Sequence, residues 1–133
     1  MNKNKRQLIY DKFNGLCAYT GKPLGDDWQV DHVISKNWSK YYKDTSLEID
    51  ENHIDNLFPA LRIVNHYKRA FDLEGFRQYM LRFHLRLAKL PKTTRVNATE
   101  KRKEYMYKVA DAFDIRIDKP FNGVFYFETI NLK

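Results

Sequence analysis

Two polar, titratable residues, Asp31 and His32, stand side by side in a segment that otherwise alternates like a β-strand. The segment, residues 28–35, reads WQVDHVIS. Its alternating apolar residues are Trp28, Val30 and Ile34. His32 falls on that apolar face, where an isolated histidine is usually a satisfied core residue. Beside a carboxylate it could instead perform acid–base chemistry near neutral pH, so the rest of the chain decides between the two interpretations.

Further polar residues follow at definite steps after this strand. Asn56 lies in the segment IDNLFPA, and Asn65 and Lys68 lie in the segment LRIVNHYKRAF at 61–71. At about 100° per residue the latter is an amphipathic helix. Its apolar face holds Ile63, Val64, Tyr67 and Phe71, and its polar face holds Arg62, Asn65, His66 and Arg69. The predicted order is strand, long polar loop over 35–55, short edge strand over 57–60, and helix.

In this order and in these residues the chain resembles the HNH endonuclease family, whose core is a ββα-metal unit. The residues that carry the resemblance are VDH at 30–32, DNL at 55–57 and NHYK at 65–68. The family pattern has Asp-His, then Asn-Leu about two dozen residues later, then Asn or His nine residues on and a Lys three further. The version with asparagine at that last ligand position is similar to the HNH nuclease domain of RNA-guided CRISPR enzymes. The match covers about residues 16–72.

The resemblance implies a role for each matched residue. His32 would be the general base, because neutral imidazole accepts protons near pH 7. Asp31 and Asn65 would hold one divalent ion through oxygen atoms, most simply Mg²⁺, with Mn²⁺ or another divalent ion as alternatives. Asn56 would tie the loop backbone and help to orient His32. Lys68 would contact the scissile phosphate.

Arg62 and Arg69 would extend that phosphate contact.

Two points about the site stay open. Strict pleating points Asp31 and His32 to opposite faces, so the strand must end or bulge near residue 32 if both serve one metal. His66 could replace Asn65 as the third ligand; we favour Asn65 for its nine-residue step from Asn56, which leaves His66 to contact DNA.

The chain departs from the family at the zinc ribbon that braces many members. The four ribbon positions are here Cys17, Thr20, Leu61 and Val64. One cysteine cannot hold a tetrahedral zinc ion. We therefore expect no structural zinc, and expect Cys17 to be a small buried core residue.

The elements that must position these residues give an α+β protein, with a ββα-metal core flanked by basic helices. Helices are predicted at 3–13, 73–90 and 98–113, and a strand with a turn at 16–24. Asn97 followed by Glu100 suggests a capping box for the third of these helices. The tail, IRIDKPFNGVFYFETINL, alternates around Asn122-Gly123 and predicts a C-terminal β-hairpin.

Charge favours a nucleic-acid partner. The chain has a net charge of +7. Residues 62–108 hold thirteen basic and four acidic residues, whereas residues 24–61 are acidic. We expect Arg82, Arg86 and Lys89 to extend a DNA-binding track, although a charge run is usually only a solvated face. They lie on one side of the 73–90 helix, away from its apolar stripe of Phe76, Tyr79, Met80, Phe83 and Leu87.

The 133 residues fit one domain, 1–133. No apolar run is long enough to span a membrane, and a cytoplasmic setting is expected. The sequence thus predicts a metal-dependent endonuclease that cuts one DNA strand per active site. RNA is not excluded, and a homodimer is possible if double-strand cleavage is required. The alternatives are a catalytically inactive nucleic-acid-binding module with the same fold, and a purely structural helical domain.

Overall fold

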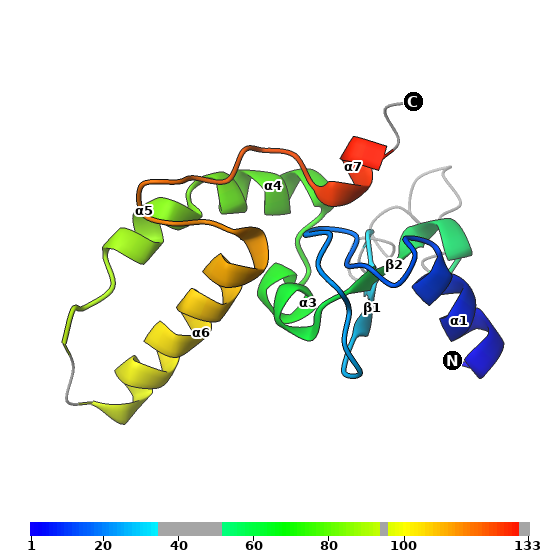
Figure 1. Cartoon of the computed structure of the whole chain (residues 1–133), viewed down its shortest axis with the longest axis horizontal. Helices are drawn as coiled ribbons and strands as arrows, with labels where there is room; N and C mark the ends of the chain where they lie inside the picture. Colours follow the sequence, from blue (N-terminus) through cyan, green and yellow to red (C-terminus); the bar gives the residue numbers. More distant parts are fainter. Residues whose placement is uncertain (35–51, 94–95, 131–133) are drawn as a thin grey trace, which may run out of the picture.

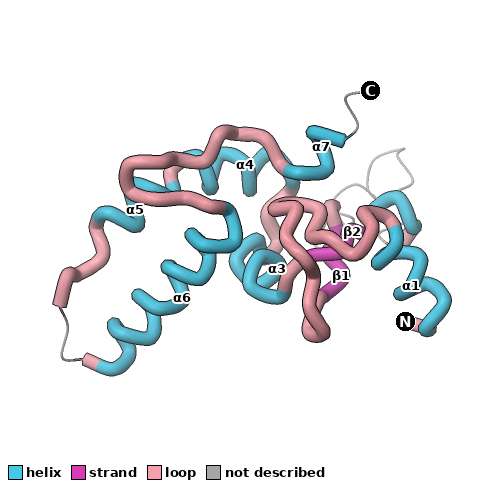
Figure 2. The backbone as a smooth tube through the Cα atoms, viewed as in Figure 1, coloured by secondary structure: helices cyan, strands magenta, loops and turns pink. Residues whose placement is uncertain are grey.

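A computed structural model describes residues 1–34, 52–93 and 96–130 of the chain. Its described residues combine helices with one small two-stranded sheet, which agrees with the predicted α+β class (Figures 1 and 2). The elements are α1 (Lys3–Asp11), β1 (Gln29–His32), η1 (Ile54–Asn56), β2 (Leu57–Ala60), α3 (Arg62–Lys68), α4 (Leu73–Leu81), α5 (Phe83–Ala88), α6 (Asn97–Phe113) and α7 (Tyr126–Ile130). Most of the predicted loop over 35–55 lies outside the described residues.

The two strands form an antiparallel pair that lies between α1 and α3 (Figure 1). In its register Asp31 faces Phe58 and His32 faces Leu57, so β1 runs without a bulge to its last residue, His32. β2 covers the predicted edge strand, which contains Pro59. Proline lacks a backbone N–H donor and is therefore confined to edge strands, and both strands of a two-stranded sheet are edge strands. Because α3 follows β2 after one residue and packs against β1, strand, strand and helix form a compact unit.

Helix α3 is shorter than the predicted 61–71 segment. It ends at Lys68 because Arg69 adopts φ 54°, a left-handed conformation that cannot continue a right-handed helix. Val64 and Tyr67 are buried as expected, but Lys68 is buried with them. The buried side of α3 therefore includes a charged residue, which hydrophobic periodicity could not predict.

The predicted 73–90 helix is divided into α4 and α5 at Arg82, whose backbone (φ −100°, ψ 1°) leaves helical geometry. Asp72 caps α4 by accepting a hydrogen bond from the Gly75 amide at 2.7 Å. The apolar stripe is confirmed in burial: Phe76, Met80, Phe83 and Leu87 are buried. The break keeps this stripe on the core while the chain changes direction (Figure 1).

The expectation at the start of α6 was wrong in one detail. The helix begins at Asn97 rather than after it, so Val96 occupies the N-cap position and the predicted capping box does not form. The expected strand over 16–24 is likewise reduced to a single bridge between Leu16 and Pro23.

The predicted C-terminal β-hairpin was wrong. The described tail has only an isolated bridge between Arg116 and Lys119, and residues from Tyr126 form helix α7. Phe125, just before α7, is fully buried and stacks on Phe76 with ring centroids 5.5 Å apart. Glu128 accepts a hydrogen bond from the Phe125 amide, which starts the helix. Packing and this cap override the alternating pattern of the sequence.

No helix in the described ranges is both long and apolar enough to cross a membrane.

Candidate functional site

Asp31 lies inside the protein, on the side of β1 that faces α3. Its side chain is 3% exposed. Oδ2 accepts a hydrogen bond from the Tyr19 hydroxyl, and Oδ1 lies 3.2 Å from Nζ of Lys68. Burial raises the pKa of Asp31, although the Lys68 ammonium opposes this shift. Both carboxylate oxygens thus already have protein partners.

Lys68 is the cation of this buried group and is fully buried itself. Besides Asp31, its ammonium donates to the backbone carbonyl of His32 at 3.3 Å. The prediction that Lys68 contacts DNA phosphate does not hold in this conformation, because no part of its side chain reaches solvent. The sequence placed Lys68 on an amphipathic helix, and only the fold reveals that its ammonium is buried against Asp31.

Tyr19 completes the buried group and was missed by the sequence reasoning. Its side chain is 1% exposed, and its ring packs edge-on against Phe76 and Phe125. Burial, followed by the nearby Asp31 carboxylate, raises the pKa of Tyr19 well above its ordinary value. The phenol therefore stays protonated and serves as a donor to Asp31. An aromatic residue in the run LCAYTG predicts core packing, but nothing in that run indicates the partner of its hydroxyl.

Asn65 lies on the same side of β1 as Asp31. Its Nδ2 donates to Oε1 of Gln29 at 2.8 Å, and Gln29 is two residues before Asp31 on one face of the strand. Its amide oxygen, Oδ1, accepts no hydrogen bond from the described residues. Asn65 therefore presents an oxygen that remains available as a ligand.

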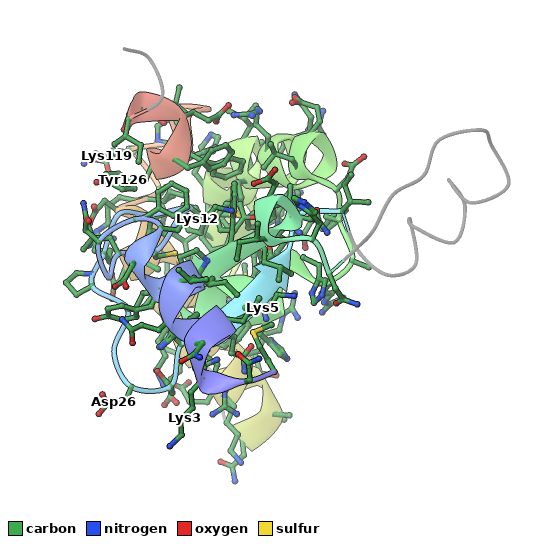
Figure 3. The ribbon with its side chains drawn as sticks, turned by 90° about the vertical axis from the view of Figure 1, so that its right-hand side faces the viewer. Lys3, Lys5, Lys12, Asp26, Lys119 and Tyr126 are labelled. Carbon is green, nitrogen blue, oxygen red and sulfur yellow. The ribbon has the colours of Figure 1, made fainter. Side chains whose placement is uncertain are left out.

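His32 points to the other side of β1, as strict pleating requires. Its Nε2 lies 3.2 Å from Oδ1 of Asn52, and the backbone carbonyl of Asn52 accepts a hydrogen bond from Nζ of Lys5 at 2.7 Å. In the tautomer that carries its proton on Nε2, this nitrogen can donate to the amide oxygen while Nδ1 keeps its lone pair. Lys5 lies on α1, which faces the viewer in Figure 3. The sequence did not reveal that Asn52 contacts His32 or that Lys5 in turn contacts Asn52.

Asn56 fixes the backbone immediately after His32. Its Oδ1 accepts from the Ile34 amide at 2.7 Å, its Nδ2 donates to the Ile34 carbonyl at 3.0 Å, and its own carbonyl accepts from the Val33 amide. The expectation that Asn56 ties the loop backbone is confirmed by these bonds. It acts on His32 through residues 33 and 34 and not through the imidazole ring.

His66 lies outside this group, on the exposed side of α3. Its Nδ1 is 2.6 Å from the Tyr105 hydroxyl of α6. The two side chains line a hollow of about 380 Å³ together with Asp27, Arg62, Ile63 and Lys108. Because His66 points toward α6 and away from β1, the structure places Asn65, and not His66, on the side of Asp31.

The predicted phosphate contacts divide into two groups. Arg62, Arg69, Arg82 and Lys89 are exposed. Arg86 is not an exposed cation: its guanidinium stacks 3.7 Å from the Tyr79 ring centre and donates to the Tyr67 hydroxyl and the Tyr79 carbonyl. The expectation that Arg86 projects away from the apolar stripe was therefore wrong.

The positions that correspond to the zinc ribbon of the family lie among apolar groups. Cys17 is fully buried, and its Sγ accepts a hydrogen bond from the Leu61 amide at 3.5 Å. Val64 is buried as well. Within residues 1–34, 52–93 and 96–130, no three His, Cys, Asp or Glu side chains come together as a metal cluster would require.

The possible metal ligands on the side of β1 that faces α3, its inner side, suit a hard divalent ion only in part. Asp31 offers a carboxylate and Asn65 an amide oxygen, which are the oxygen ligands that Mg²⁺ prefers. However, Oδ1 of Asp31 is held by the Lys68 ammonium and Oδ2 by Tyr19. Each carboxylate oxygen keeps a further lone pair, so a divalent ion that binds Asp31 must either share an oxygen with one of these donors or displace that donor.

Comparison of the chain with protein-family models, with curated proteins and with solved structures finds no significant match.

Proposed function

We propose that the protein is a metal-dependent endonuclease of the HNH type, which hydrolyses phosphodiester bonds in DNA. The observation that carries the proposal is the arrangement around the end of β1. Asp31 and Asn65 lie on its inner side, His32 is the last residue of the strand, and Asn56 ties the backbone that follows.

His32 is the general base of the proposed reaction. Its Nδ1 would accept the proton of the attacking water, while Asn52 holds the protonated Nε2. Asp31 and Asn65 would hold the divalent ion, which stabilises charge on the phosphate when it is bound. The exposed residues Arg62 and Arg69 would contact the DNA backbone. One such site cuts one strand.

A second function, a nucleic-acid-binding module without catalysis, is favoured by one specific observation. Both oxygens of Asp31 are engaged by protein donors, and the carboxylate is almost fully buried. A purely structural carboxylate would have this environment. The two functions differ in what Mg²⁺ does: it drives nicking in the first case and is without effect in the second.

The deciding experiment is nicking of a supercoiled plasmid with Mg²⁺, with Mn²⁺ and with a chelator, beside a labelled RNA of equal length. Nicked circles that form only with metal support the nuclease, and conversion to linear DNA only at high protein concentration indicates paired sites. Metal-independent binding without nicking supports the silent module. A higher Mg²⁺ requirement for Asn65→Ala than for His66→Ala supports Asn65 as the ligand; the reverse order assigns His66.

A further inference from the structure

The buried Lys68 ammonium lies where it shields Asp31 from any other cation. It touches Oδ1 at 3.2 Å, and Tyr19 occupies Oδ2. Lys68 and Asp31 are 0% and 3% exposed, so little water is present to screen a second positive charge. A divalent ion at Oδ1 and the ammonium at its present position would repel each other strongly. The ion and the ammonium therefore compete for this oxygen.

We propose that Lys68 is an exchangeable internal counter-ion, which leaves Asp31 when a divalent ion binds and then pairs with a phosphate of the nucleic acid. This inference rests on the proposed nuclease function, because it assumes that Asp31 binds metal. It makes the described conformation the metal-free resting state. It also gives one lysine two successive partners, a carboxylate and a phosphate.

The local backbone permits this exchange. Lys68 is the last residue of α3, and the chain leaves the helix at Arg69. Its four-carbon stem can therefore swing without unwinding a central helical turn. The two hydrogen bonds of the ammonium are long, 3.2 Å to Oδ1 and 3.3 Å to the His32 carbonyl. Rotation of the side chain breaks both together.

The chemistry of the displaced ammonium selects its new partner. A lysine ammonium removed from a carboxylate needs another anion, and phosphate is the anion that the substrate of this site carries. The neighbouring exposed cation, Arg69, would contact the same backbone. Metal and nucleic acid should therefore bind cooperatively: metal releases Lys68, and phosphate stabilises the released position.

The first test uses the unaltered protein and chemical labelling of amines, read by mass spectrometry. Without metal, Lys68 should react at least tenfold more slowly than Lys101, an exposed lysine at the start of α6. Saturating Mn²⁺ should raise the labelling of Lys68 at least tenfold and leave that of Lys101 unchanged. Lys68 that stays protected at a Mn²⁺ concentration shown by calorimetry to be bound would overturn the proposal.

The second test compares Mn²⁺ affinities by calorimetry for the unaltered protein, Lys68→Met and Asp31→Asn. Removing the competing ammonium should tighten Mn²⁺ binding at least tenfold in Lys68→Met, and Asp31→Asn should lose binding. Equal affinities for the unaltered protein and Lys68→Met, with metal-dependent nicking intact, overturn the exchange alone. Absence of binding in both proteins, with no nicking, overturns the metal-dependent function and the exchange with it. If Lys68→Met does not fold, the labelling test decides.

Discussion

Asn56 pairs through its side-chain amide with both backbone polar groups of Ile34, and so joins η1 to the chain after β1. Asn56→Asp keeps the shape of the side chain but replaces the Nδ2 donor with an acceptor that faces the Ile34 carbonyl. We expect it to lower the free energy of unfolding by about 1–3 kcal/mol, because a partly buried hydrogen bond is lost. Denaturant unfolding measures the change.

The matched control is Asn122→Asp. Asn122 is exposed and uses only its oxygen, which accepts from the Val124 amide, so aspartate can keep that bond. Equal losses in the two variants would show that the Asn56–Ile34 pair has no special weight.

His32→Ala should lower the nicking rate by about 10²–10⁴ and leave DNA affinity within a few-fold, because the imidazole moves a proton and does not anchor phosphate. Single-turnover nicking and a binding titration measure the two quantities. The control is His84→Gln on α5, which should nick at the unaltered rate. Near-normal nicking by His32→Ala would remove this residue from the mechanism.

The exposed and the packed cations of α4 and α5 should differ in DNA binding. Arg82→Ala with Lys89→Ala should flatten the log–log salt dependence of binding by up to about two units, since each phosphate contact contributes about −0.9. Arg86→Ala should leave that slope unchanged and instead destabilise the fold by about 1–3 kcal/mol, through the lost stacking and hydrogen bonds. A slope that responds only to Arg86→Ala would reverse this assignment.

Arg77 fastens helix α7 to α4 through Glu128, and this contact should make stability depend on acid. Hydrogen bonding from Arg77 holds the pKa of Glu128 below its ordinary 4.5. A folded pKa below the unfolded value adds stability that is present above about pH 4.5 and is lost as the pH falls through the folded pKa. Glu128→Gln should therefore destabilise by about 1.5–3 kcal/mol at pH 7 and progressively less below pH 4.5.

The control for this effect is Glu104→Gln, at an exposed position of α6. It should show neither the loss at pH 7 nor the change with acid. Parallel stability profiles for the unaltered protein and Glu128→Gln across that range would contradict the coupling.

Chelators should leave the fold intact. Cys17 is buried beside the Leu61 amide, and Val64 fills another of the ribbon positions, so packing replaces zinc. Thermal unfolding with and without a strong zinc chelator should give the same Tm, and elemental analysis should find no stoichiometric zinc. Unfolding on chelation would show that the protein needs the metal.

The sequence predicted elements whose patterns match their packing and failed where tertiary contacts decide. The 57–60 edge strand and the apolar stripe of the 73–90 helix are confirmed, because burial follows periodicity there. The C-terminal hairpin was wrong because Phe125 packs into the core and Glu128 caps a helix. Glu128, three residues after Phe125, supplies one half of a capping box, but Phe125 lacks the side-chain oxygen that would have made the signal readable in the sequence.

The candidate site divides in the same way. The resemblance to the HNH family predicted that Asn56 would tie the loop, and pleating predicted that Asp31 and His32 would point apart. Spacing could not predict that Lys68 is buried against Asp31, since a lysine is almost never fully buried unless it is paired and its partner is distant in sequence. Tyr19 was unpredictable for the same reason, because its partner is distant in sequence.

The single thiol of the chain, Cys17, has a consequence for experiment. Cys17 lies in the segment after α1, and its side chain is fully buried against the Leu61 amide just before α3. A thiol reagent therefore reaches it only when this part of the core opens. The rate of its modification, measured under native conditions, then reports the free energy of that opening. Because the sequence has no second cysteine, a single mass increment on the intact protein measures the modification of Cys17. Its rate can therefore be compared between all the variants considered above as a measure of core opening.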